Sequence, residues 1–318
     1  MLIKMNGGIG DMLLLTIITK KYLLEYGRPC SLLTLFPEIF THNPSIKKIY
    51  TSENLILKIL EKLNLKFHDI TYRCWSSLLP EKKDLFNSHV VEQFCYQLGL
   101  QGKVQLKPEL YYIDNELDPP NLPSKPYVVV QSQASNSNHP QTTKNWGGEN
   151  MQTVVNYLSK SFNIIQLGDK RDLPLENTAC LKGKTSIRES GLILKNAILF
   201  VGLEGALMHI ARAVDCQSVI VWGGRLKPYQ VGYPCFENIN VDMDCSPCWI
   251  PNACPNDMAC MKEISPRQVI DRIENLLASK KEILEVDEIL VSKKITPIKM
   301  KEEILKFPPH LDHLIQGN

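Results

Sequence analysis

A glycine-rich turn ending in an aspartate lies close to the amino terminus. Its residues are Gly7-Gly-Ile-Gly-Asp11, preceded by an apolar run and followed by helical spacing. Glycines let backbone amides approach a ligand at the positive end of a helix, which also stabilises a carboxylate. Asp11 is therefore a candidate general base, with Gly8 and Gly10 as ligand-contacting residues. The alternative is a tight turn with a simple N-terminal charge, because the spacing lacks the complete dinucleotide-binding fingerprint.

A second candidate segment is Thr142-Thr-Lys-Asn-Trp146, which lies between a predicted strand and a predicted helix. Loops in this position bind ligands in open α/β sheets. Thr143 and Lys144 offer a hydroxyl and an ammonium group, and both suit a diphosphate. The alternative is a solvated lysine beside a packing tryptophan.

A third segment, Val201–Ala211, is a strand end, a small-residue turn and the start of a helix. The first backbone amides of such a helix have no intrahelical partner and can hold phosphate oxygens. A carboxylate here can accept hydrogen bonds from the hydroxyls of a ribose or a sugar. The candidate contacts are Glu204, Gly205, Ala206, Leu207, Met208 and His209. His209 is ambiguous, since a single histidine on an apolar helix is commonly a structural residue.

Four of the ten cysteines cluster near the carboxyl end, at Cys245, Cys248, Cys254 and Cys260. Prolines between them favour a compact loop that presents four thiolates tetrahedrally. Four thiolates leave no open coordination position, so we expect a structural zinc or iron site rather than a catalytic metal. The alternative is a knot of buried, reduced thiols without metal.

These segments are positioned by alternating strands and helices, the pattern of a parallel sheet covered by helices. Apolar runs predict strands at Leu2–Met5, Ser31–Phe36, Tyr127–Gln131, Ile164–Leu167, Ile198–Val201 and Ser218–Trp222. Helical spacing predicts helices at Met12–Tyr26, His89–Leu98, Asn150–Lys160, Ile187–Lys195, about Ala206 to Val214, and Arg267–Leu277. The sequence therefore predicts an α/β protein of two doubly wound blocks.

Two domains are expected, because 318 residues exceed the size at which one hydrophobic core usually stops growing. The proline-dense stretch Asp118–Pro126 is the predicted linker. We expect an N-terminal domain over residues 1–122, a second over 123–278, and a helical tail over 279–318, with helical potential near Lys281–Leu290.

Composition excludes several classes of partner. A net charge of +2 gives no reason to expect nucleic-acid binding. No run of eighteen apolar residues predicts a membrane span, and Asp11 and the glycines interrupt any signal-peptide core. Without a secretory signal, the cysteines are expected to be reduced thiols in the cytoplasm.

Together these motifs resemble glycosyltransferase family 9, the heptosyltransferase-like group of GT-B enzymes, from about Met1 to Leu277. The resemblance rests on the order and spacing of Gly7-Gly-Ile-Gly-Asp11, Asn43-Pro-Ser-Ile-Lys-Lys-Ile49, His89-Val-Val-Glu92, Lys144-Asn-Trp146, Val201-Gly-Leu-Glu-Gly-Ala-Leu-Met-His209 and Cys260-Met-Lys-Glu-Ile-Ser265.

The resemblance implies two Rossmann-like domains facing each other across a cleft, with the acceptor on the N-terminal side. It implies inverting, metal-independent transfer of a heptose or related sugar from an ADP-heptose-like donor. Asp11 matches the family's proposed base and Lys144 its phosphate-binding lysine, while the helix start at Gly205–Met208 holds the diphosphate.

The acceptor implied by the resemblance is a saccharide, a lipid-linked saccharide of lipopolysaccharide biosynthesis, or a protein. The enzyme is then cytoplasmic or peripheral at the inner membrane, and an oligomer is compatible with the sequence. Where heptosyltransferases commonly carry Asn-Asp-Ser-Gly-Pro, this chain has Leu203-Glu-Gly-Ala-Leu207, so the donor stays open.

Two alternatives remain at this point. One is a nucleotide-sugar epimerase of the same fold, which needs a second acid or base that the sequence does not identify. The other is a non-enzymatic, metal-organised scaffold with a degenerate nucleotide pocket.

Overall fold

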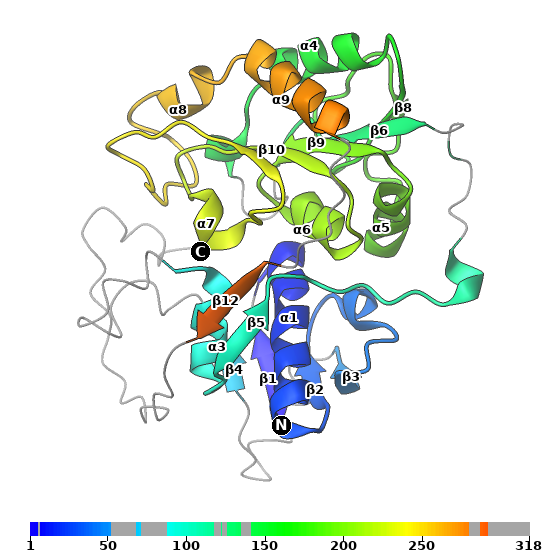
Figure 1. Cartoon of the computed structure of the whole chain (residues 1–318), viewed down its shortest axis with the longest axis vertical. Coiled ribbons are helices and arrows are strands. Elements are labelled where there is room, and N and C mark those ends of the chain that lie inside the picture. The colour runs from blue at the N-terminus through cyan, green and yellow to red at the C-terminus, as the bar shows by residue number, and fades with distance from the viewer. Residues whose placement is uncertain are drawn as a thin grey trace.

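Two parallel sheets organise the protein in the computed structural model, which describes residues 1–5, 7–51, 68–70, 88–117, 122, 126–134, 141–279 and 287–291 (Figure 1). The first sheet has the strand order β3-β2-β1-β4. All of its neighbouring strands run parallel. Its strands are β1 (Leu2–Met5), β2 (Cys30–Leu33), β3 (Ile46–Tyr50) and β4 (His68–Ile70).

The second sheet is also wholly parallel and has the order β11-β10-β9-β6-β7-β8. Read along the chain, this is the doubly wound 3-2-1-4-5-6 order, in which ligands bind at the carboxyl ends of the strands where the order reverses. The reversal falls between β6 and β9. The strands are β6 (Tyr127–Val130), β7 (Asn163–Gln166), β8 (Ala179–Cys180), β9 (Leu199–Leu203), β10 (Ser218–Val221) and β11 (Glu237–Ile239).

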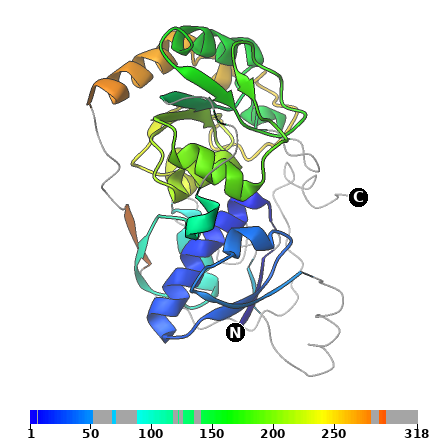
Figure 2. The ribbon, with the colours of Figure 1, turned by 90° about the vertical axis from the view of Figure 1, so that its right-hand side faces the viewer.

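Helices cover both faces of the second sheet (Figures 1 and 2). Helices α4 (Gly148–Leu158) and α9 (Pro266–Ser279) pack with one face of its strands in one apolar cluster. Helices α5 (Ile187–Lys195) and α6 (Ala206–Ala213) lie on the other face, in a second cluster. Apolar residues at helical spacing on one side of each helix account for this layering.

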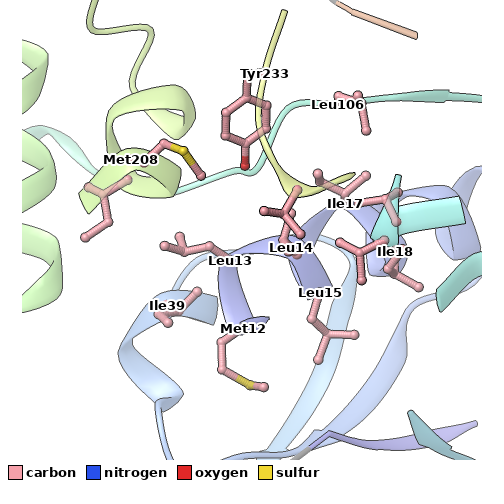
Figure 3. Packing of buried hydrophobic residues seen from close by; sticks show 14 of the residues in the cluster. Met12, Leu13, Leu14, Leu15, Ile17, Ile18, Ile39, Leu106, Met208 and Tyr233 are labelled. Carbon is pink, nitrogen blue, oxygen red and sulfur yellow. The ribbon is translucent and has the colours of Figure 1, made fainter. Parts of the chain in front are cut away.

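Helix α1 (Ile9–Tyr26) joins the two halves of the molecule. Every residue from Met12 to Thr19 is buried, so the helix has no solvated face there. Its residues share one hydrophobic cluster with the first sheet and with α6. Figure 3 shows Met208 of α6 and Tyr233 over the side of α1 that carries Leu13 and Leu14. Burial on all sides explains why no charged residue occurs between Met12 and Thr19.

The predicted strands and helices are confirmed at their centres, and most ends differ by one to three residues. The remaining described elements are α3 (Val90–Gln97), β5 (Gly102–Gln105), α7 (Pro228–Val231), α8 (Ala259–Lys262), β12 (Glu288–Val291), and the short 3-10 helices η1 (Pro37–Phe40), η4 (Asp114–Glu116) and η5 (Thr142–Lys144). Among the described helices, none is long and apolar enough to cross a membrane.

One prediction is wrong: the helical potential assigned near Lys281–Leu290 does not extend to its last three residues. Glu288–Val291 is a strand, and it pairs antiparallel with β5. Backbone pairing with an available edge overrides a weak local helix preference. The rest of the tail, and most of the predicted linker over 118–126, lie outside the described residues, so the domain boundaries stay a prediction.

Candidate active site

Asp11 lies at the carboxyl end of β1, in the first turn of α1. The backbone N–H of Gly8 donates a 2.7 Å hydrogen bond to the Asp11 carboxylate, which folds the side chain back over the glycine turn. A Cβ on Gly7 would come within 2.4 Å of the same carboxylate, so only glycine fits there. The turn therefore fixes the carboxylate at the positive end of α1, where its negative charge is stabilised.

Lys144 and Glu204 form an ion pair at the carboxyl ends of the central strands of the second sheet. The ammonium nitrogen lies 2.5 Å from the carboxylate, and the two side chains are only 12% and 10% exposed. Glu204 directly follows β9, and Lys144 ends the η5 turn after β6. Both side chains thus stand where the strand order reverses, the ligand-binding position of this topology.

Burial and charge act in opposite directions on this pair. Burial lowers the pKa of the Lys144 ammonium, which Glu204 and, more weakly, Asp11 oppose. Burial alone raises the pKa of Glu204, but the charges of Lys144 and Arg225 outweigh it, so its pKa lies below its usual value. Each member of the pair therefore favours the charged form of the other, and Asp11 on the first sheet lies within electrostatic range of Lys144.

Helix α6 begins at Ala206, two residues after Glu204, with Gly205 between them as its N-cap. The side chains of Leu207 and Met208 are buried in the core, so these residues can offer a ligand only backbone N–H groups. Ala206 and Gly205 are partly exposed at the helix start. The amides of this first turn are donors that a phosphate can accept from.

His209 is a buried residue with a defined orientation. Its Nδ1 lies 2.6 Å from the Tyr233 hydroxyl, and burial lowers its pKa to about 3, so the ring is neutral. A Cβ on Gly10 would stand 2.9 Å from His209 Cδ2 and 3.9 Å from the Ala206 Cα. The glycine turn that carries Asp11 and the start of α6 therefore meet directly, which brings Asp11 and the Lys144–Glu204 pair to one junction.

Thr143 does not offer its hydroxyl to a ligand in this structure. The hydroxyl donates to the carbonyl of Ile250 at 2.6 Å, the carbonyl of Pro251 lies 3.0 Å from it, and the side chain is buried. Its backbone N–H also donates to Pro251. Thr143 therefore ties the turn that carries Lys144 to the cysteine segment, a role that its position in the sequence did not indicate.

The four cysteines of the predicted metal site lie around one space in the structure. Cys245, Cys248, Cys254 and Cys260 all line one cavity of about 40 Å³. The backbone N–H of Gly224 donates to the Cys260 sulfur at 3.1 Å, and burial raises the pKa of Cys248. In the described part of the chain, however, no group of three or more His, Cys, Asp or Glu side chains is arranged to hold a metal ion.

Two residues of this junction were missed or left without an argument at the level of sequence. Tyr233 belongs to no motif, and its proximity to His209 arises from tertiary packing alone. Arg225 follows β10 after a pair of glycines, and a glycine pair after a buried strand at this edge is a signal that could have identified it.

A larger cavity of about 430 Å³ lies at the amino end of β7 and has no charged residue in its lining.

Comparison of the sequence with known protein families gives one match. The family described as glycosyltransferase family 9 (heptosyltransferase) matches residues 99–248. No curated protein sequence matches the chain. The matched segment contains Lys144, Glu204 and His209, whereas Asp11 lies before it.

Solved structures with low sequence identity share the fold. The iron-containing dodecameric glycosyltransferase TibC from enterotoxigenic E. coli H10407 is 17% identical, with 88% of this chain and 77% of that chain covered and a TM-score of 0.69. The family 9 glycosyltransferase from Veillonella parvula DSM 2008 is 13% identical, with 88% of this chain and 97% of that chain covered and a TM-score of 0.68. E. coli ADP-heptose lps heptosyltransferase II is 14% identical, with 88% of this chain and 99% of that chain covered and a TM-score of 0.67. Another TibC structure contains ADP-D-β-D-heptose.

The fold and the matched segment define a glycosyltransferase with the GT-B architecture. Over residues 99–248 the chain matches glycosyltransferase family 9, the family that the resemblance of its motifs predicts.

Proposed function

We propose that this enzyme transfers a heptose or related sugar from an ADP-heptose-like donor to an acceptor hydroxyl, with inversion at the anomeric carbon. One observation carries the proposal: Asp11 and the Lys144–Glu204 pair lie at the switch points of two sheets whose helices α1 and α6 meet through Gly10 and His209. A base and a diphosphate site are thus held at one junction.

In the proposed reaction, Asp11 removes the proton from the acceptor hydroxyl, and the oxygen attacks the anomeric carbon from the side opposite the diphosphate. The bond between the anomeric carbon and the diphosphate oxygen breaks, and the nucleoside diphosphate leaves with both bonding electrons. Lys144 and the first amides of α6 stabilise the charge that develops on the leaving oxygen. Glu204 accepts hydrogen bonds from hydroxyls of the donor.

The donor assignment is supported by the relatives of the same fold, among which TibC binds ADP-D-β-D-heptose and another is named an ADP-heptose heptosyltransferase. Glu204 bears on this donor site, because its carboxylate is paired with the Lys144 ammonium. A donor phosphate must displace that carboxylate from the ammonium, or share it, to bind there.

For the acceptor we propose a saccharide, lipid-linked or free, or a protein. Each offers the hydroxyl that Asp11 requires. We also propose that the enzyme works in the cytoplasm, with domains over residues 1–122 and 123–278, and that copies of the chain assemble, as TibC does into a dodecamer.

The cysteine cluster is proposed to hold a structural zinc or iron ion. Its donor set fits either metal, and TibC is iron-containing. Cys245, Cys248, Cys254 and Cys260 would be the ligands, and the metal would cross-link the loop that Thr143 contacts. Metal analysis of the purified protein tests this: about one zinc or iron per chain, lost on replacing Cys248 with serine, is expected, and a metal-free wild-type chain contradicts it.

The proposed activity is tested by incubating the enzyme with a panel of nucleotide diphosphate sugars and candidate acceptors. The anomeric configuration of the product is then read by NMR. We expect one donor to be used and its configuration to be inverted. Retention of configuration would exclude the mechanism, and the absence of binding to every nucleotide sugar would exclude the function.

A further inference from the structure

Arg225 lies at the carboxyl edge of the second sheet, within electrostatic range of Lys144 and Glu204. It follows β10, the strand next to β9, after Gly223 and Gly224. The carbonyl of Arg225 accepts a 3.1 Å hydrogen bond from Trp249, and that of Gly224 accepts one of 2.9 Å from Cys248. The cysteine segment therefore fixes the backbone of Arg225 in the same way that it fixes the turn of Lys144.

The guanidinium group points at that turn. Its Nη1 donates to the side-chain oxygen of Gln141, the N-cap residue of the η5 turn that ends in Lys144. Its Nε is buried and has no hydrogen-bond partner in the described part of the chain. A buried donor without a partner is costly, unless a ligand completes it.

Charge balance distinguishes Arg225 from Lys144. Lys144 and Glu204 neutralise each other, whereas Arg225 forms no ion pair with any described carboxylate and contacts only a neutral amide. Its charge acts on both members of the pair. Burial is the main cause of the lowered pKa of Lys144, and the charge of Arg225 lowers it further. The same charge helps to lower the pKa of Glu204. An anion that binds Arg225 therefore does not have to displace a carboxylate from it, whereas an anion that binds Lys144 competes with Glu204.

We infer that Arg225 binds the diphosphate of the donor, and that it supplies, together with Lys144, the positive charge that the leaving group requires. A guanidinium can bind phosphate oxygens through two parallel hydrogen bonds, and the Gln141 amide is a neutral partner that a phosphate can replace. This inference rests on the proposed function, since it assigns a further residue to the same donor site.

The test compares Arg225→Gln and Arg225→Lys with the wild type and with Arg171→Gln. Arg171 is a matched control because it lies in the loop after β7 and is bonded to Asp169. Calorimetry with ADP, GDP and UDP first identifies the diphosphate that the wild type binds best. That diphosphate, its monophosphate and its nucleoside are then titrated into each folded variant.

We expect Arg225→Gln to weaken diphosphate binding about 10- to 100-fold, as loss of a charged hydrogen bond predicts, and to leave nucleoside binding unchanged. Arg225→Lys should lose less, and Arg171→Gln nothing. Undiminished diphosphate binding by Arg225→Gln, or equal losses for diphosphate and nucleoside, overturns the inference. If Arg225→Gln does not fold, the same comparison is made with Arg225→Lys. Failure of the wild type to bind any diphosphate instead contradicts the proposed function.

Discussion

Removing either partner of the Lys144–Glu204 pair should destabilise the protein strongly, and removing both should cost less than the sum. The two side chains are 12% and 10% exposed and their charged atoms are 2.5 Å apart. Loss of one partner leaves the other charge buried and unpaired, which costs about 3–5 kcal/mol. Lys144→Met and Glu204→Gln should each lower the free energy of unfolding by this amount, and the double variant should show a coupling of about 1–3 kcal/mol.

The same variants should separate in their binding of a nucleoside diphosphate. Lys144→Met removes a charged hydrogen bond to phosphate, worth about 1.5–3 kcal/mol, so its affinity should fall about 10- to 100-fold. Glu204→Gln removes a competitor of the phosphate, so its affinity should stay equal or rise.

Urea denaturation and calorimetry measure the two quantities. Lys262 and Asp257 form a control pair that is 59% and 87% exposed, so Lys262→Met should change the stability little. Strictly additive losses in the double variant would refute the reasoning. Equal losses of diphosphate affinity in Lys144→Met and Glu204→Gln would also refute it.

Three further outcomes are expected. Gly10→Ala should reduce transfer by an order of magnitude or more, because its Cβ would come within 2.9 Å of His209, and unchanged kinetics would contradict this contact. Burial lowers the pKa of His89 to about 4, so the free energy of unfolding of the wild type should fall as the pH falls from about 6.5 to 4. In His89→Asn, which keeps the helix cap, urea denaturation should show a fall over this pH range that is smaller by about 3 kcal/mol. An equal fall in both proteins contradicts the assignment. Thr143→Val should lower the melting temperature and weaken diphosphate binding, because it releases the turn of Lys144 from the Ile250 carbonyl; unchanged affinity would show that this tie does not position the lysine.

The sequence predicted the sheets and helices well, because each central element is an apolar run of the right length. Val128 and Val130 of β6, for example, are buried beneath helices, so a short continuous apolar run there could only be a buried strand or a core helix. The tail was less predictable. Glu288–Val291 pairs with β5 through backbone hydrogen bonds, which leave no signal in the side-chain pattern.

The candidate site was predictable where chemistry and topology coincide. Asp11, Lys144 and Glu204 all follow strands at switch points, so residue type and position together pointed to them. The direction of a small side chain was not predictable, and Thr143 turns its hydroxyl to the cysteine segment. Tyr233 is placed beside His209 by folding of distant segments, for which spacing along the chain carries no information.

The central claim is that Asp11 is the base of the transfer. The most direct measurement compares Asp11→Asn with the wild type in transfer rate, diphosphate affinity and melting temperature. Asparagine can still accept the hydrogen bond from Gly8, so the turn is retained. We predict unchanged diphosphate affinity and stability with a rate lower by about 10²–10⁴-fold, the usual contribution of a general base. A transfer rate close to that of the wild type would contradict the account.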